Sequence, residues 1–228
     1  MKIIVYTANI GGYDHFNTPT TYDKNIRYIM FTDNKIIKSD VWEINHVNFL
    51  SDDITNRKKA RYIKLNPHKV LPEHDISIWI DHCFTPRFND AYELLKNMSF
   101  FKMNSEIMIF KHTWRTCIFS EAEEVLRKKL DEPKIVKSQM RRYMSEKFPQ
   151  NLGLFETGFI VRNNNEHVNK FNELWWSEVS KGSGRDQLSN MYVSWKTKLP
   201  ISPIELGKSQ YDNPFLEPKK NHTVLLRF

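Results

Sequence analysis

The feature of this 228-residue chain that most constrains its fold is the alternation of short apolar runs with longer amphipathic segments. Six runs have the length and the β-branched and aromatic content of strands, at residues 2–8, 26–33, 41–47, 75–81, 106–112 and 154–162. Six helical segments lie between and after them, at 54–66, 89–97, 120–130, 134–147, 165–180 and 186–196. Strands that alternate with helices predict an α/β fold, with a mixed, mostly parallel central sheet flanked by helices.

Local signals set several boundaries. Pro67 should end the first helix, and Asn89 or Asp90 should cap the second. Ser120 and Glu123 have the spacing of a capping box at the start of 120–130. The last residues, 222–228, are expected to form a strand or an extended arm.

Composition and charge narrow the class of protein. Apolar residues make up 40% of the chain and aromatic residues 13%, which excludes a disordered tail. No run approaches the roughly 18 apolar residues that a membrane span needs, so we expect no transmembrane segment. Cys83 and Cys117 are too few for a disulfide framework, and we expect reduced thiols in a cytoplasmic protein. The net charge of +7 favours an anionic partner, although a solvated basic surface explains it equally well.

Polar side chains follow several of the predicted strands where each strand ends. They are Thr7 and Asn9, Thr32 and Asp33, Asp81 and His82, and Lys111 and His112. Ligands of open α/β sheets bind outside the carboxyl ends of the strands. The sequence therefore predicts a ligand site at this edge.

Asp81 ends a strand that is nearly all apolar. A carboxylate at the exposed end of such a strand could hold a divalent ion, with His82 as a second ligand. Aspartate together with histidine suits Mn²⁺, whereas an all-oxygen set suits Mg²⁺. An aspartate that caps the following turn explains the same residue equally well.

Arg57, Arg61 and Lys64 are spaced i, i+4 and i+7, so they share one face of the first predicted helix. Two guanidinium groups and an ammonium group suit a diphosphate, because guanidinium grips phosphate oxygens with two hydrogen bonds. An ordinary amphipathic surface helix would show the same pattern.

Two further groups of polar residues are candidates. His112, Trp114 and Arg115 could act as a base, a stacking platform and an anion clamp; alternatively, His112 is structural and Trp114 belongs to the core. The strand 154–162 carries polar residues beside Gly158, where glycine would let a ligand approach the backbone. Asp186 could bind sugar hydroxyls at a helix start or serve only as the N-cap, after a glycine-bearing segment, 181–184, that is expected to move.

The chain resembles a glycosyltransferase-like family that was long catalogued as a domain of unknown function and includes a plant seed-mucilage glycosyltransferase. The resemblance rests on five segments in the family's order, from about Lys2 to Trp195. They are YTANIGGYD, RKKARYIKLNPHK, IWIDHC, HTWRTCIFSEAEEV, and ETGFIVRNN with RDQLSN. The last pair is also similar to retaining transferases of the glycogenin type.

The resemblance implies a single GT-A-like, Rossmann-like domain over residues 1–228. Its nucleotide-binding half would span about 1–112 and its acceptor half about 113–228. The activity it implies is transfer of a sugar from a nucleotide-diphosphate sugar to a glycan or another hydroxyl acceptor, assisted by Mn²⁺ or Mg²⁺. Two departures stand out: His82 and Cys83 follow Asp81 where a second carboxylate is usual, and Glu156 stands where the glycogenin type has asparagine.

The resemblance also assigns roles to residues of this chain. The donor would be bound by Thr7, Asn9, Tyr13, Arg57, Arg61 and Lys64, and the metal by Asp81 and His82. The sugar and acceptor would contact His112, Arg115, Thr157 and Arg185. The catalytic residues would be Asp186, Glu156 and Gln187. One of the two carboxylates would be the general base of an inverting enzyme, or a carboxylate or Gln187 would shield the oxocarbenium-like centre of a retaining one.

Three alternatives remain open. A nucleotide-sugar or glycan-binding module without catalysis would bind the donor and not turn it over. A metal-dependent hydrolase using Asp81, His82 and His112 would need no acceptor. A nucleic-acid-binding domain ranks last, because the chain shows no motif of that class, and we expect no nucleic-acid partner.

Overall fold

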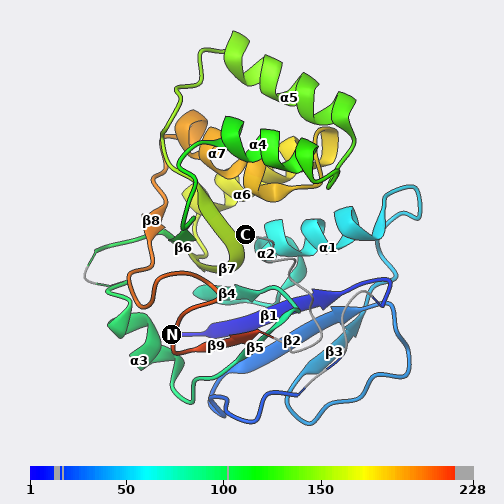
Figure 1. The fold of residues 1–228 in the computed structure, drawn as a ribbon. Coiled ribbons are helices and arrows are strands. Elements are labelled where there is room, and N and C mark those ends of the chain that lie inside the picture. The colour runs from blue at the N-terminus through cyan, green and yellow to red at the C-terminus, as the bar shows by residue number, and fades with distance from the viewer. Residues whose placement is uncertain (13–15, 17, 102, 219–228) are drawn as a thin grey trace.

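The computed structural model describes residues 1–12, 16, 18–101 and 103–218. Seven strands form one sheet in the order β3-β2-β1-β4-β7-β6-β8 (Figure 1). They are β1 (Ile3–Asn9), β2 (Arg27–Thr32), β3 (Glu43–His46), β4 (Ile76–Ile80), β6 (Ile107–Lys111), β7 (Phe155–Asn163) and β8 (Ser202–Pro203). Within this sheet only β7 runs antiparallel to its neighbours. The prediction of a mixed, mostly parallel sheet is therefore confirmed, as are the six predicted strands.

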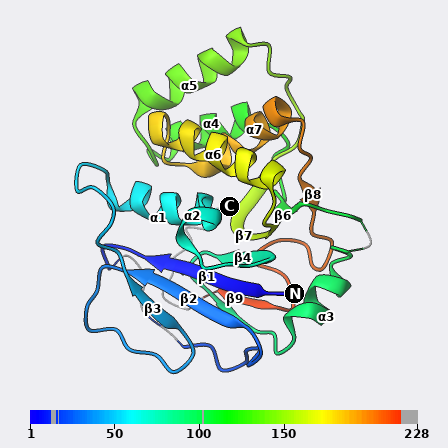
Figure 2. The ribbon, with the colours of Figure 1, turned by 180° about the vertical axis from the view of Figure 1, so that it is seen from behind.

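Helices cover both faces of the sheet. On one face lie α1 (Asn56–Leu65), α4 (Ile118–Arg127), α5 (Pro133–Ser145), α6 (Glu166–Lys181) and α7 (Asn190–Thr197). The other face carries α3 (Ala91–Asn97) and a two-stranded ribbon of β5 (Phe84–Pro86) and β9 (Leu216–Pro218). Seen from behind in Figure 2, α1 lies above β1, and α6 lies above α1 and α2 (Pro67–Val70). The fold is therefore α/β, with helices on both faces of one sheet.

Two buried clusters account for this layering. In β1, Ile4 and Tyr6 belong to the core beneath α1 and α6, whereas Ile3 and Val5 belong to the core beneath α3. Successive side chains of a strand point to opposite faces, so an apolar strand without alternation must be covered on both sides. The nearly continuous apolar character of β1 and β4 thus specifies a central position in the sheet.

Some local predictions were wrong. Helix α4 begins at Ile118 with Cys117 as its N-cap, and the Ser120 hydroxyl donates to the Cys117 carbonyl, so the proposed capping box does not form. The segment 186–196 is not one helix but a 3₁₀ turn, η1 (Asp186–Leu188), followed by α7. A short helix that sequence analysis missed, α2 (Pro67–Val70), starts at the proline that ends α1. The expected arm at 222–228 lies outside the described residues.

The sheet reverses its direction of growth beside β1. The chain adds β2 and β3 on one side of β1 and then places β4 on the other side. Such a switch point leaves a crevice beyond the carboxyl ends of the two strands, which here are Asn9 and Ile80. Because β7 is antiparallel, its first residues lie at the same edge. In the sheet, β6 from the first expected half lies between β7 and β8 from the second half. The division into halves near residue 112 stays a prediction.

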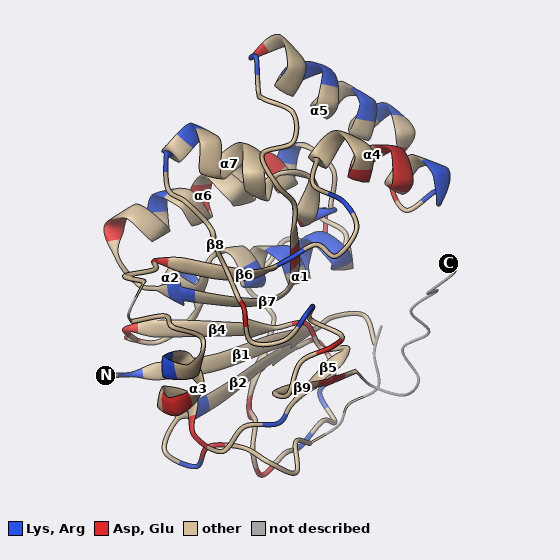
Figure 3. Ribbon diagram, turned by 60° about the vertical axis from the view of Figure 1, so that its left-hand side comes forward, with Lys and Arg blue, Asp and Glu red and all other residues tan. Residues whose placement is uncertain are grey.

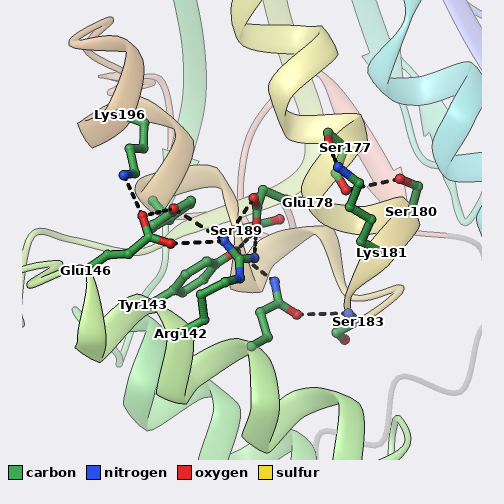
Figure 4. Close-up of polar contacts among 12 residues, drawn as sticks. Arg142, Tyr143, Glu146, Ser177, Glu178, Ser180, Lys181, Ser183, Ser189 and Lys196 are labelled. Carbon is green, nitrogen blue, oxygen red and sulfur yellow. Dashed lines mark hydrogen bonds and ion pairs between the residues drawn. The ribbon is translucent and has the colours of Figure 1, made fainter.

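Helix α5 is held against α6 and α7 by a polar network (Figure 4). Arg142 pairs with Glu178, which also accepts a hydrogen bond of 2.7 Å from the Tyr143 hydroxyl. Tyr143 stacks on Tyr192 with 3.7 Å between ring centroids, and the Tyr192 hydroxyl donates to Glu146 at 2.6 Å. These contacts fix α5 at the top of the molecule in Figure 1, from where it also reaches the loop before η1.

A second polar group lies inside the core, under the last turn of α1. Arg162 is fully buried, and its Nη2 donates to the Lys64 carbonyl at 2.7 Å. The Tyr6 hydroxyl donates to the same carbonyl at 2.7 Å and accepts from Arg162. The last carbonyls of a helix have no partner within the helix, so this pair satisfies one of them and fixes where α1 ends.

Tyr6→Phe should lower the free energy of unfolding by about 1–3 kcal/mol, because it removes a buried hydrogen-bonding group without leaving a cavity. Urea unfolding measures the change. Tyr92→Phe is the matched control, since Tyr92 is 55% exposed. Equal stability of the two variants would show that the carbonyl of Lys64 does not depend on Tyr6.

Candidate functional site

A pocket of about 540 Å³ opens at the edge of the sheet where β1, β4 and β6 end and β7 begins. Helix α1 and the segment leading into α4 form its sides. It is lined by most of the residues that sequence analysis singled out: Asn9, Arg57, Arg61, Asp81, His82, His112, Arg115, Glu156, Thr157, Arg185, Asp186 and Gln187. Residues from six distant segments therefore converge on one cavity.

Two of the expected donor-binding residues, Thr7 and Lys64, do not line this pocket. Thr7 is buried, and its hydroxyl has no hydrogen-bond partner among the described residues. Lys64 is fully buried and contacts carboxylates instead of the open pocket. Tyr13 lies outside the described residues.

At the floor of the pocket, two cations from α1 meet two carboxylates. The Lys64 Nζ lies 2.6 Å from Asp186 Oδ2 and 3.2 Å from Asp81 Oδ1. Arg61 lies 3.3 Å from Asp186 Oδ1 and 3.9 Å from Asp81 Oδ1. We call Arg61, Lys64, Asp81 and Asp186 the charge quartet. Its formal charge is zero, so the four groups can be buried together.

The quartet controls the protonation of Asp186. Burial acts to raise the pKa of this carboxyl, but the positive charges of Arg61 and Lys64 outweigh burial and hold its pKa at about 2. Burial lowers the pKa of Lys64, and the two carboxylates oppose that effect. Asp186 is therefore a permanent anion at neutral pH. Asp186 is the first residue of η1, and the N-cap is Arg185. The interpretation of Asp186 as an N-cap is therefore wrong.

Asp81 and His82 are the pocket's candidates for a metal. Asp81 Oδ1 already accepts a 2.6 Å hydrogen bond from the Trp79 indole besides its contact with Lys64. Within the described residues, no group of three or more His, Cys, Asp or Glu side chains is arranged to hold a metal ion. Mg²⁺ and related ions are often held by one or two carboxylates together with substrate phosphates. The residues thus fit an ion that enters with a diphosphate.

The carboxylate of Glu156 also lines the pocket, and its environment differs from that of Asp186. It is buried near the start of β7, and its Oε2 accepts the backbone N–H of Gln210 at 3.0 Å. Burial raises the pKa of this carboxyl above its ordinary value, although hydrogen bonds from Gln210 and Thr113 oppose the change. Glu156 and Asp186 therefore differ in basicity, and Glu156 is the stronger base.

Gly158 lines the pocket, where the expected ligand contact stays a prediction, and it also has a packing role. A Cβ at this position would lie 2.3 Å from the Gln210 side-chain oxygen and 2.9 Å from Phe84. That oxygen accepts the Gly158 N–H at 2.8 Å. The space beside the glycine is thus filled by Gln210, which sequence analysis missed together with its neighbour Tyr211. No periodic pattern marks this irregular segment as part of a site.

His112 organises the loop between β6 and α4. Its Nδ1 accepts the backbone N–H groups of Trp114 and Arg115, both at 3.1 Å. Burial, together with the charge of Arg115, lowers the pKa of His112 to about 4, so the ring is neutral at pH 7. Arg115 in turn donates to Glu121 at 2.6 Å. A weakly basic ring whose Nδ1 already accepts two donors is a poor general base, so His112 has a structural part in the loop.

Two arginines of the pocket have no carboxylate partner within ion-pair distance among the described residues. Arg57 donates to the Leu130 carbonyl at 2.9 Å, and its side chain packs against Gly184. Arg185 acts on Asp186 only at longer range. Asp131 accepts from the Ser183 hydroxyl at 2.7 Å and from the Gly184 N–H at 2.9 Å. The expected movement of this glycine-bearing segment stays a prediction. The pocket therefore has positive charge available for an anion.

The fold and the pocket define an α/β protein with an anion-suited site at the switch point of its sheet. The chain belongs to the TOD1/MUCI70 family: the model of the TOD1/MUCI70 glycosyltransferase-like domain matches residues 1–208. The family expected from the sequence is thus confirmed. A comparison with curated proteins gave no match. Among the described residues, no helix combines the length and apolarity needed to cross a bilayer.

Replacing Lys64 should change how stability depends on pH. The pKa of Asp186 in the fold lies below its ordinary 3.8, so its contribution is complete above that value and is lost as the pH falls toward 2. Lys64→Met removes one of the cations that hold this pKa down. The loss of unfolding free energy on acidification, on the order of 2 kcal/mol from this group in the native chain, should become smaller.

Urea unfolding at about pH 6, 4 and 3 measures this dependence. Lys58→Met is the matched control on the same helix, because Lys58 donates to the Ser180 carbonyl and not to a carboxylate. The same pH dependence in all three proteins would contradict the role given to Lys64.

Proposed function

We propose that this protein transfers a sugar from a nucleotide-diphosphate sugar to a hydroxyl acceptor in the pocket described above. The observation that carries the proposal is the pair of arginines, Arg57 and Arg185, that line the pocket with no carboxylate within ion-pair distance among the described residues. Membership of a glycosyltransferase-like family supports the same reaction class.

The positive side of the pocket suits a leaving diphosphate. Arg57 and Arg61 come from α1, whose basic residues are visible in Figure 3, and Arg185 comes from the loop before η1. Negative charge grows on the diphosphate as the bond to the sugar breaks. Donors fixed in advance around that position stabilise the transition state more than the ground state. Asn9, at the end of β1, also lines the pocket and would contact the donor.

A divalent ion, Mn²⁺ or Mg²⁺, is part of the proposal. Asp81, with His82 beside it, would hold the ion against the diphosphate. Bound there, the ion would neutralise charge on the phosphate oxygens. Lys64 and Arg61, at 3.2 Å and 3.9 Å from Asp81 Oδ1, hold this side chain in position.

We assign different roles to the two carboxylates. A general base works best when its pKa lies near the working pH, and burial moves Glu156 in that direction. Glu156 is therefore our choice for the group that accepts the proton of the acceptor hydroxyl. Asp186, held as an anion by the quartet, suits electrostatic stabilisation of the positive charge on the sugar ring, with Gln187 next to it.

Arg57→Gln and Arg185→Gln should each weaken binding of a nucleoside diphosphate. A charged hydrogen bond is worth about 1.5–3 kcal/mol, which corresponds to roughly a ten- to hundredfold rise in Kd. Isothermal titration with UDP, GDP, ADP and CDP, each with Mn²⁺ or EDTA, identifies the base and measures the change. If Mn²⁺ strengthens diphosphate binding to the native protein but not to Asp81→Asn, the result would support a metal ion held by Asp81.

The matched control is Arg141→Gln, because Arg141 is exposed on α5 and does not line the pocket. Free nucleosides should bind all variants equally, since they lack phosphates. Loss of nucleoside and diphosphate binding to the same degree would mean that the arginines support the fold and not the ligand.

Glu156→Gln should lower kcat by about 10²–10⁴-fold, the usual contribution of a general base, while donor affinity stays unchanged. In the native enzyme, the acid limb of kcat/KM should lie above the ordinary glutamate value of 4.5. Sugar transfer from the donor found by titration is the measurement, followed as a function of pH.

Glu123→Gln is the matched control, because Glu123 is exposed on α4 and does not line the pocket. Full turnover by Glu156→Gln would exclude Glu156 as the base. Donor binding without turnover in the native protein would instead indicate a binding module.

A further inference from the structure

Trp114 lies in the loop between β6 and α4. Its side chain is 68% exposed, and it lines the pocket. The alternative that Trp114 is a core residue is therefore wrong. An indole exposed to water inside a cavity keeps a large apolar face available to a ligand.

The loop that presents Trp114 is held in place. The buried ring of His112 accepts the backbone N–H groups of Trp114 and Arg115. Two backbone hydrogen bonds flank the loop: the main-chain N–H of His112 donates to the Leu154 carbonyl at 2.8 Å, and that of Gly153 donates to the Thr116 carbonyl at 2.9 Å. A platform already fixed by such contacts loses little conformational entropy when it binds. The exposure of the indole is thus built into the fold.

The polar groups around Trp114 differ from those beside α1, because their charges are compensated. Arg115 pairs with Glu121 at 2.6 Å, and Glu124 pairs with Lys128 at 2.9 Å. All four of these side chains line the pocket. They offer hydrogen-bond donors and acceptors without net charge. This wall therefore suits a neutral ligand with many hydroxyl groups, whereas the wall with Arg57 and Arg185 suits an anion.

A pyranose ring has these properties. Its hydroxyl groups match charge-compensated donors and acceptors, and its C–H groups, which carry slight positive charge, match the negative face of an indole. The wall also lies next to the chemistry: the hydroxyl of Thr113, the residue before Trp114, is 3.4 Å from Glu156 Oε1. A sugar on Trp114 would bring a hydroxyl close to this carboxylate.

We propose that Trp114 is the platform of an acceptor subsite for a neutral glycan, with the pairs Arg115–Glu121 and Glu124–Lys128 as its polar rim. The inference rests on the proposed transferase function and names its acceptor class. It goes beyond the family match, which specifies neither acceptor nor subsite.

The test is a titration of the ¹⁵N-labelled protein followed through its tryptophan indole signals. The chain has six tryptophans, and the signal that disappears in Trp114→Phe belongs to Trp114. The probes are cellobiose, maltose and N,N′-diacetylchitobiose, with sorbitol as a polyol that has no ring. At least one disaccharide should shift the Trp114 signal in a saturable way, and sorbitol should not.

Trp114→Ala should weaken the binding of that disaccharide at least tenfold, and Trp114→Phe should weaken it less because an aromatic face remains. Trp176→Phe is the matched control, since Trp176 lies on α6 and does not line the pocket. In the transfer reaction, Trp114→Ala should raise the KM for the acceptor and leave the Kd of the nucleoside diphosphate unchanged.

Three results would overturn the inference: no disaccharide shifts the Trp114 signal, a free nucleoside shifts it instead, or Trp114→Ala leaves disaccharide affinity and acceptor KM unchanged. The test separates this inference from the proposed function. Saccharide binding at Trp114 without any sugar transfer would retain the subsite and reject the transferase. Sugar transfer that is unchanged by Trp114→Ala would retain the transferase and reject the subsite.

Discussion

The contact between Lys64 and the two carboxylates Asp81 and Asp186 is the interaction on which the site depends. Burying an ammonium group costs several kcal/mol unless opposite charges and hydrogen bonds surround it. Here the ammonium lies 2.6 Å and 3.2 Å from the two carboxylates, and Arg61 completes a neutral quartet. Removing any single member would leave a buried charge uncompensated. The quartet therefore ties α1, the end of β4 and η1 into one fixed arrangement.

The interior of the fold supports that arrangement from behind. Arg162 and Tyr6 fix the carbonyl of Lys64, so the backbone that carries the buried ammonium cannot shift freely. On the other side of the quartet, the Trp175 indole donates to the Asp186 carbonyl at 3.0 Å. Core and site thus share residues. Substitutions in the core of this protein are expected to shift the positions of the pocket residues, even where no side chain of the pocket is changed.

The pocket joins a positively charged wall to a wall whose charges are compensated. The wall beside α1 and η1 carries Arg57 and Arg185, which have no carboxylate within ion-pair distance among the described residues. The wall beside α4 carries the exposed indole of Trp114 and the ion pairs Arg115–Glu121 and Glu124–Lys128. Glu156 and Asp186 lie in the same cavity but differ in basicity, because only Asp186 is surrounded by cations. A charged donor and a neutral acceptor would be held on different sides of two carboxylates with different tasks. This division is the physical basis of the proposed reaction.

The sequence by itself determined the α/β class, the six main strands and the polar residues at their ends, because strand periodicity and helix spacing are local properties. It also led to the pocket residues from Asn9 to Gln187, since open α/β sheets place their ligands at one edge. Only the tertiary structure decided the antiparallel direction of β7, the burial of Lys64 against Asp186 and the place of Gln210 beside Gly158. These partners are distant in sequence, and Lys64 looks like any surface lysine on a helix. Which charge meets which, and hence which carboxylate is basic, depends on long-range packing that no local pattern records.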